Sequence, residues 1–284
     1  MYPAAMQRIY TTLLLALALL ISAPVAAADS SAFDRVMKSG TLRCGYVVGA
    51  PYFTIDAATN KKSGIWYDLT QEMGKWLDLK VEWVEEIGFG EIGAALDSGR
   101  IDALCVGIWV NPDRAKAMDF TNPVTYSAVH AYVREGDARF DNNLDKINDP
   151  AISIACLDGE MSATIAGEDY PKAKTVCLPQ MSAHSEMMMN VSQSKADVLF
   201  ATPSVVAKYN EKNTPKLAKV KTSHPIRLFA ETIAVARGND DLRRMLSHTV
   251  QFLIDSGKVD KIVDKYAEKP EDFIRTAKPY EAAR

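Results

Sequence analysis

The sequence predicts an α/β protein of two similar lobes, each built around a parallel-type mixed sheet, with a ligand cleft between them. Predicted strands alternate with predicted helices along most of the 284 residues, as parallel sheets require. The strand at Ile101–Val106 is continuously apolar, which is typical of strands covered on both faces. The length also exceeds the roughly 250 residues at which single cores stop growing. These observations together favour two lobes.

The first lobe is expected to contain three strands, each associated with a helix. Apolar residues at helical spacing mark the helices, and Ser98-Gly99 ends the last of them. The expected helices lie at Phe33–Ser39, Tyr67–Leu77 and Glu91–Leu96, and the expected strands at Thr41–Val48, Lys80–Glu85 and Ile101–Val106.

The second lobe repeats this pattern from about Ala151. Its segment Ser194-Lys-Ala-Asp197-Val-Leu parallels Ser98-Gly-Arg-Ile-Asp102-Ala-Leu of the first lobe, with an aspartate before each apolar strand. The expected strands are Ile152–Leu157, Thr175–Leu178 and Ala196–Phe200; the helices are Met161–Ala166 and His184–Ser192; and the exposed loops are Glu135–Asn143 and Asn210–Lys216. Two further helices, Asp240–Ile254 and Lys258–Tyr266, are expected to close the chain.

Residues 1–28 have the pattern of a secretory signal peptide. Arg8 precedes the apolar run Leu13–Ile21, Pro24 follows, and Ala26–Ala28 supplies the small residues that a signal peptidase requires. An uncleaved anchor is the alternative, although the run is short for a membrane span. We therefore expect an exported protein of the periplasm.

Composition and motifs exclude several functional classes. The chain carries 33 Lys and Arg against 36 Asp and Glu, and this balance gives no electrostatic reason to bind nucleic acid. The sequence contains no GxSxG, no HExxH and no P-loop lysine, and its four histidines show no ligand spacing. We expect neither a metal nor a cofactor.

Two motifs invite interpretations that their context does not support. Gly88–Gly93 matches GxGxxG, but no acidic residue ends a second strand about 20 residues on, where ribose binding requires one. Met187–Met189 could suggest a soft-metal site, yet consecutive helical residues point about 100° apart and cannot converge on one ion. We expect packing at the methionines and no dinucleotide at the glycines.

The segment from Gly107 to Arg114 carries the clearest binding signal. The apolar strand ends at Gly107, a loop through Trp109 follows, and Arg114 lies at the start of the next expected helix. An arginine fork beside backbone N–H donors is suited to clamp a carboxylate. A surface arginine that caps a helix is the alternative for any such residue taken alone.

Several motifs in order resemble the family 3 solute-binding proteins of amino-acid ABC importers, from about Thr41 to Tyr266. They are Pro51-Tyr-Phe, Gly64-Ile-Trp-Tyr-Asp68-Leu, Phe89, Leu96–Asp102, Asn111–Arg114, Asp119–Pro123, Asp158–Ser162 and Asp255–Ile262. The resemblance implies the two-lobed periplasmic-binding-protein fold, with residues 29–125 and 231–284 in lobe 1 and 126–230 in lobe 2. Val124–Ala128 and Leu228–Thr232 would be the segments that cross between the lobes.

The resemblance also implies roles for individual residues. Arg114 would pair with a ligand carboxylate, helped by N–H groups near Trp109 and Met161. Phe89 would stack on the ligand, and the carbonyl of Gly107 would remain open to it.

Three positions depart from the family pattern and bear on ligand type. Trp109 stands where a serine or threonine is usual, Thr202 where an aspartate usually binds the ammonium, and Tyr46 where basic-amino-acid binders often have an acid. An aromatic site of this kind suits a carboxylate whose remainder is apolar, or whose cation is delocalised or alkylated. The alternative is that a different acid pairs with an ordinary ammonium, the candidates being Asp158, Glu160 and Glu231.

The four cysteines would meet an oxidising compartment after export. Cys44 and Cys105 are expected on neighbouring strands of lobe 1, and Cys156 and Cys177 on neighbouring strands of lobe 2. Pairing within each lobe leaves the cleft free to open, whereas the other two pairings would lock it. Four buried thiols remain the alternative.

The function expected from these features is capture of a small carboxylate-bearing solute, such as an amino acid, by lobe closure. The protein would be a monomer that delivers its ligand to the membrane permease of an ABC importer. One alternative is an exported enzyme on the same scaffold, of the cyclohexadienyl (arogenate or prephenate) dehydratase type, with Glu160 or Asp158 as general acid. Another alternative is a ligand sensor for a membrane receptor.

Overall fold

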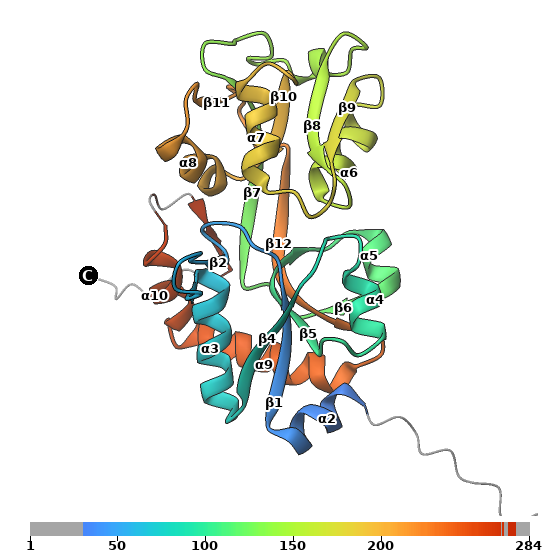
Figure 1. Cartoon of the computed structure of the whole chain (residues 1–284), viewed down its shortest axis with the longest axis vertical. Coiled ribbons are helices and arrows are strands. Elements are labelled where there is room, and N and C mark those ends of the chain that lie inside the picture. Colours follow the sequence, from blue (N-terminus) through green and yellow to red (C-terminus); the bar gives the residue numbers. More distant parts are fainter. Residues whose placement is uncertain (1–30, 268, 270–271, 277–284) are drawn as a thin grey trace, which may run out of the picture. The chain divides into compact units, whose positions relative to one another are not determined.

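The computed structural model describes residues 31–267, 269 and 272–276 (Figure 1). The signal peptide expected at residues 1–28 lies outside the described residues. Among the residues described, no helix has the length and apolar character needed to cross a bilayer.

Two long strands, β7 (Thr125–Arg134) and β12 (Arg227–Ala236), run from one lobe into the other (Figure 1). They are antiparallel, and their paired residues extend from Thr125 with Glu231 to Val129 with Arg227. Both segments expected to cross between the lobes lie within or beside this pairing. The crossing is therefore a two-stranded ribbon rather than two separate loops.

The remaining strands form a parallel group on each side of this ribbon. The first group is β4 (Lys80–Glu86), β1 (Thr41–Tyr46) and β5 (Ala103–Trp109), with β5 antiparallel to β12. The second group is β9 (Lys174–Leu178), β8 (Ser153–Leu157) and β10 (Val198–Ala201), with β10 antiparallel to β7. Across the described residues the two expected sheets thus join into one 11-stranded ladder.

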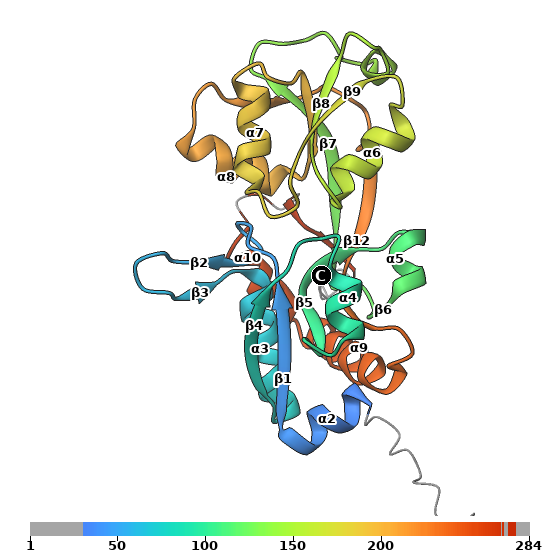
Figure 2. The same cartoon turned by 45° about the vertical axis from the view of Figure 1, so that its right-hand side comes forward.

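Short strands complete the ladder and add a small hairpin. The hairpin projects sideways from the first lobe (Figure 2). These strands are β2 (Thr54–Ile55), β3 (Lys62–Ser63), β6 (Met118–Phe120), β11 (Leu217–Lys219) and β13 (Ile274–Arg275).

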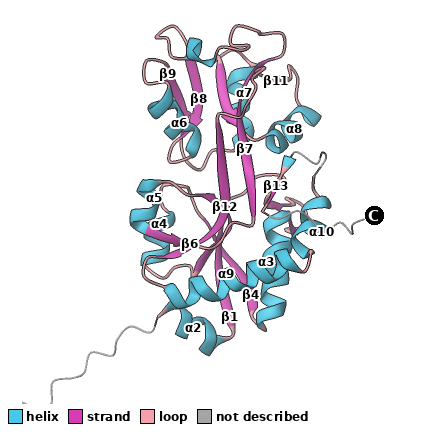
Figure 3. Cartoon of the chain, turned by 180° about the vertical axis from the view of Figure 1, so that it is seen from behind, coloured by secondary structure: helices cyan, strands magenta, loops and turns pink. Residues whose placement is uncertain are grey.

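Helices cover the strands of both lobes, and Figure 3 shows α3 beside α9 in the first lobe and α6 beside β8 in the second. In the first lobe they are α2 (Ala32–Ser39), α3 (Ile65–Leu77), α4 (Ile92–Asp97), α5 (Pro112–Ala117), α9 (Asp240–Asp255) and α10 (Lys258–Asp264). In the second they are α6 (Met161–Asp169), α7 (His184–Ser192), α8 (Pro203–Lys212) and the 3₁₀ helix η1 (Leu144–Ile147).

Apolar residues of the central strands form the cores. In β5 the side chains of Leu104 and Cys105 are both buried, as the continuous apolar run predicts for a strand covered on both faces. Among the described residues, the core of the first lobe is one cluster, which contains Trp66 and Phe53. The second lobe has two, one around Phe200 and Tyr170 and one around the methionines of α7.

The two segments that repeat in the sequence have the same structural role. The Asp102 carboxylate accepts the N–H of Arg43 at 2.8 Å, and the Asp102 N–H donates to the Arg43 carbonyl at 2.8 Å. In the second lobe Asp197 makes the same reciprocal pair with Ser153, at 2.9 Å in both directions. Each aspartate thereby fastens the start of its strand to a neighbouring strand of its own lobe, β1 in the first lobe and β8 in the second.

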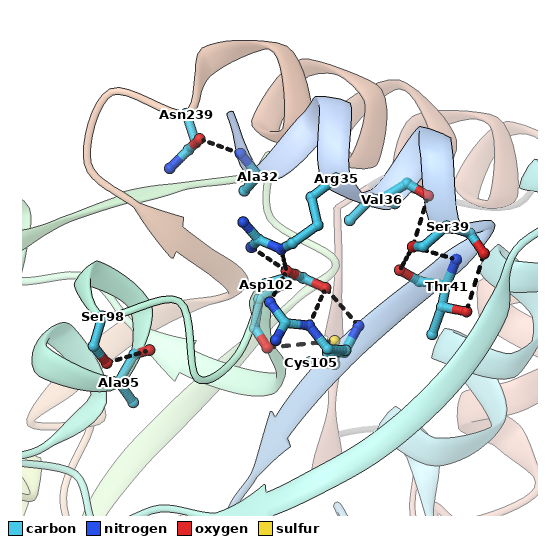
Figure 4. A network of polar contacts seen from close by, with 12 residues as sticks. Ala32, Arg35, Val36, Ser39, Thr41, Ala95, Ser98, Asp102, Cys105 and Asn239 are labelled. Carbon is cyan, nitrogen blue, oxygen red and sulfur yellow. Dashed lines mark hydrogen bonds and ion pairs between the residues drawn. The ribbon is translucent and has the colours of Figure 1, made fainter. Parts of the chain in front are cut away.

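Arginine side chains form ion pairs with both aspartates. Asp102 is buried and accepts from the guanidinium groups of Arg35 and Arg43, and Figure 4 shows Arg35 of α2 reaching Asp102. Asp197 is paired with Arg139 at 2.8 Å and is less buried. We therefore expect the stability of the first lobe to depend more on Asp102 than that of the second lobe does on Asp197.

We expect Asp102→Asn to lower the free energy of unfolding by about 2–3 kcal/mol, because it removes a buried charge that several N–H groups share. We expect a loss of stability at the low end of the range for a broken buried ion pair, because the side chains of Arg35 and Arg43 are about one third exposed and can be hydrated in the variant. Urea denaturation measures it. Asp113→Asn is the matched control: that ion pair with Lys116 is exposed, so stability should not change. Equal effects of the two substitutions would contradict this role for Asp102.

Helix α8 differs from expectation. Its last residues, Asn210–Lys212, fall in a segment predicted to be an exposed loop. The segment lacks strong helix formers at several positions, but Pro203 occupies the first turn, where proline is favoured, and Val206 and Tyr209 are buried against the core. Tertiary packing therefore outweighs the weak local propensity.

Candidate functional site

A cavity of about 630 Å³ lies between the two lobes. Strand ends and loops of the first lobe form one wall, and the loops before α6 and α7 together with helices α7 and α8 form the other. Six of the seven ligand-binding residues expected from the sequence line it: Phe89, Gly107, Trp109, Arg114, Met161 and Thr202.

Arg114 is held by backbone carbonyls from both lobes. Its Nη1 donates to the carbonyl of Trp109 at 2.8 Å, and its Nη2 donates to the carbonyl of Gly159 at 3.1 Å. These contacts use two of the five N–H donors of the guanidinium, so each terminal nitrogen keeps one for an anion. Burial lowers the pKa of Arg114, partly offset by Glu160, and leaves a desolvated cation facing the cavity.

The loop before α5 sets the position of this arginine. Asn111 caps the helix by accepting the Arg114 N–H at 2.8 Å, and Pro112 occupies the first helical position. Arg114 is the third residue of α5, which agrees with the sequence prediction that it lies at the start of a helix.

The opposite wall presents the N-terminus of helix α6. Met161 is the first residue of this helix, where a backbone N–H has no partner within the helix. Glu160 caps the same terminus, because its Oε2 accepts the Ser162 N–H at 2.6 Å. Glu160 also lines the cavity and lies close enough to raise the pKa of Arg114.

Aromatic rings form two sides of the cavity. The ring centroid of Phe89 lies 5.7 Å from the guanidinium carbon of Arg114. The same ring contacts His184 edge-on, with ring centroids 6.2 Å apart. Trp109 stacks on Phe229 with centroids 4.7 Å apart. Burial lowers the pKa of His184, so this ring is a neutral hydrogen-bonding group at neutral pH.

Glu231 of β12 lies deep in the wall of the cavity and is 2% exposed. Its Oε1 accepts from the Trp109 indole N–H at 2.7 Å and from the Ser127 hydroxyl at 2.6 Å. Burial raises the pKa of Glu231, and the hydrogen bonds from Ser127 and Trp109 offset part of that shift. The site thus holds a buried acid as well as a partly buried guanidinium.

Gly107 allows this acid to approach. A Cβ built on Gly107 would lie 2.0 Å from Glu231 Oε2 and 2.6 Å from the Trp66 indole nitrogen. Any side chain here would collide with the carboxylate. The glycine expected to leave a carbonyl open to the ligand therefore also makes room for Glu231.

Hydroxyl groups extend from Glu231 into the second lobe. The Tyr52 hydroxyl lies 3.3 Å from the Ser127 hydroxyl and 3.3 Å from that of Thr202. Thr202 in turn lies 3.4 Å from the Ser204 hydroxyl. Burial raises the pKa of Tyr52 to about 12, and Glu231 adds to the shift, so Tyr52 stays protonated.

Several residues have positions that the sequence did not indicate. Tyr46 does not line the cavity; it stacks on Phe53 with centroids 4.8 Å apart, because its strand continues under the aromatic cluster of the first lobe. Asp158 is exposed and also lies outside the cavity lining. Tyr52 and His184 do line it, although a single tyrosine or histidine carries no spacing signal that would have identified them.

The GxGxxG glycines lie at a contact between the lobes. Gln180 of the second lobe accepts the Gly90 N–H at 2.9 Å and donates to Glu91 at 3.2 Å. A Cβ on Gly88 or Gly90 would lie within 3.0 Å of the Gln180 side chain. Two of the motif's glycines are therefore accounted for by the close approach of the other lobe.

The methionine triplet also faces the cavity. Met187 and Met188 are buried in the second-lobe core and reach the cavity wall, while Met189 is partly exposed at its edge. Within the described ranges, no cluster of three or more His, Cys, Asp or Glu side chains is arranged to hold a metal.

The structure joins Cys44 to Cys105 and Cys156 to Cys177, with Cα atoms 5.4 Å and 4.3 Å apart. The first bridge links β1 to β5, and the second links the paired residues of β8 and β9. Each bridge stays within one lobe and does not span the cavity.

Comparison with known proteins bears on this arrangement. The family of bacterial extracellular solute-binding proteins, family 3, matches residues 42–269. The probable histidine-binding protein of Neisseria gonorrhoeae is 24% identical over 222 residues, 78% of this chain and 80% of that protein. The cyclohexadienyl dehydratase of Pseudomonas aeruginosa is 23% identical over 261 residues, 89% of this chain and 91% of the enzyme.

A solved structure gives the same result for the fold. An ancestral amino acid-binding protein, a precursor of cyclohexadienyl dehydratase, superposes with a TM-score of 0.73 and 25% identity, covering 84% of this chain and 99% of that one. The family match spans most of the two-lobed structure and contains all the residues that line the cavity. The resemblance seen in the motifs is confirmed: this chain belongs to the family 3 bacterial extracellular solute-binding proteins.

Proposed function

We propose that this protein is the periplasmic solute-binding protein of an ABC importer and captures a small carboxylate-bearing solute, an amino acid or an amino-acid-like compound. The two lobes close on the ligand, and the closed form is presented to the membrane permease. The protein acts as a monomer, and residues 1–28 direct its export.

The position of Arg114 is the observation that supports this proposal most. The arginine belongs to the first lobe, yet it donates to the Gly159 carbonyl of the second lobe. A carboxylate bound to the remaining donors would also meet the N-terminus of α6 across the cavity. One anion would therefore contact both lobes, and its binding energy would favour the closed state.

Thermal unfolding in the presence of candidate ligands tests the proposal. The panel contains the twenty amino acids, L-cystine, 2-oxo acids and dicarboxylates, each followed by calorimetry if it shifts the midpoint. A ligand present at 100 times its Kd is expected to stabilise the protein by about 2.7 kcal/mol. Glycerol and glucose, which lack a carboxylate, serve as controls. A response to such neutral solutes, with none to any carboxylate, would contradict the proposal.

The second candidate is an exported dehydratase of the cyclohexadienyl type. The buried Glu231 favours it, since burial raises the pKa of this acid and it lines the cavity, as a proton donor to a departing hydroxyl would need to. Similarity to a dehydratase over most of its length agrees with this possibility. Incubation with prephenate, followed by absorbance of the product, separates the two. Turnover that Glu231→Gln abolishes would favour the enzyme.

A further inference from the structure

Glu231 occupies an unusual place for an acid. It lies within β12, one of the two strands that both lobes share, and is paired with Trp109 of β5 on one side and Thr125 of β7 on the other. Strand interiors of this kind seldom contain a buried carboxylate unless it is paired. Its side chain nevertheless reaches the ligand cavity.

The carboxylate has hydrogen bonds but no counter-ion. Both bonds end on Oε1, from neutral donors of Trp109 and Ser127. Oε2 lies over Gly107, which itself lines the cavity. Throughout residues 31–267, 269 and 272–276, no lysine, arginine or histidine forms an ion pair with Glu231. A buried carboxylate in such a site is costly until a cation arrives.

The other acids near the cavity are less suited to a cation. Asp158 is exposed and does not line the cavity. Glu160 lines it, but its carboxylate caps α6 and faces the end of the cavity where Arg114 lies. A ligand ammonium beside Glu160 would compete with that guanidinium. Glu231 is the acid set apart from it.

The surroundings of Glu231 favour a cation that carries N–H groups. The hydroxyls of Ser127, Tyr52 and Thr202 form a chain beside it, and each can accept a hydrogen bond. A primary ammonium has three donors for these oxygens, whereas a quaternary ammonium has no N–H to donate. Thr202 thus supplies an uncharged acceptor where an aspartate is usual, and the negative charge lies on the shared strand.

We propose that Glu231 is the counter-ion for a primary ammonium of the ligand, so that the site selects a zwitterion with its carboxylate on Arg114 and its ammonium on Glu231. This rests on the proposed solute-binding function and specifies its ligand. Trp109 connects the two ends, because its carbonyl accepts from Arg114 and its indole donates to Glu231.

Calorimetry with matched ligand pairs tests this proposal. Each of the twenty amino acids and L-cystine is compared with the carboxylic acid that lacks only its α-amino groups. The wild-type protein is expected to bind the amino acid of a responding pair at least about 30-fold more tightly. Glu231→Gln should weaken that amino acid by a similar factor and leave the deaminated acid unchanged or tighter. Asp158→Asn removes an acidic charge that lies outside the cavity lining and should change neither affinity.

The possible outcomes distinguish the proposed role of Glu231 from the proposed solute-binding function. Deaminated acids that bind wild type as tightly as amino acids would overturn the role of Glu231 and leave solute binding intact. Unchanged amino-acid affinity in Glu231→Gln would do the same. A Gln variant that fails to fold would make Glu231 a structural residue and also overturn the assignment. Failure of every compound to bind would remove the proposed function itself.

Discussion

Arg114→Ala is expected to reduce the affinity for the ligand by about 30-fold to several-thousand-fold, a loss of about 2–5 kcal/mol. The substitution removes a charge-assisted fork and leaves a ligand carboxylate buried beside Phe89 without a partner. It also removes a contact between the lobes, since the Gly159 carbonyl loses its donor. Calorimetry with a ligand from the thermal screen measures the loss.

Two further variants distinguish a carboxylate clamp from a simple loss of positive charge. Arg114→Lys should restore little affinity, because an ammonium cannot form the two parallel hydrogen bonds of a guanidinium. Arg100→Ala is the matched control: Arg100 pairs with Glu85 on the surface of the first lobe, 45% exposed, and should bind as wild type does. Near-native affinity in Arg114→Ala would exclude this arginine from the site.

Removal of the first-lobe disulfide is expected to be the largest change in stability. Cys44 and Cys105 are 61 residues apart, and a loop of that length corresponds to about 4 kcal/mol of chain entropy in the unfolded state. The double replacement by serine should lower the free energy of unfolding by about that amount. Cys156 and Cys177 are 21 residues apart, which corresponds to about 3 kcal/mol.

Urea denaturation of both double-serine variants measures these effects. Ligand affinity serves as the second readout, because each bridge lies within one lobe and should leave closure unaffected. The relative stability of the two variants is the sharper test. If the second-lobe variant were less stable than the first-lobe variant, loop length would not explain the stabilisation by the disulfides. A first-lobe variant with unchanged stability would exclude a stabilising role for that bridge.

Local patterns in the sequence were sufficient for most of the fold. The repeat around Asp102 and Asp197 predicted two lobes of similar construction, and in the structure each aspartate binds the backbone of a neighbouring strand in its own lobe. Helix α7 has the predicted bounds because its apolar spacing and flanking turns agree. The long strands β7 and β12 were expected only as short crossings, because their pairing joins residues about 100 positions apart.

The site was less accessible from sequence. Arg114 and Phe89 stand in motifs whose order carried the resemblance, and both line the cavity. Glu231 was one of three acids that the sequence left as alternatives. No local sequence pattern predicts that the Glu231 carboxylate lies against Gly107. Tyr46 was expected in the site because basic-amino-acid binders often have an acid at this position, but β1 extends through this residue and it packs against Phe53.

A crystal structure with a bound amino acid identified by the thermal screen tests the central claim most directly. The account predicts one ligand in the cavity between the lobes, its carboxylate accepting from both terminal nitrogens of Arg114 and its ammonium donating to Glu231. A ligand bound outside this cavity, or one inside it whose carboxylate leaves the Arg114 guanidinium bound only to the carbonyls of Trp109 and Gly159, would contradict it.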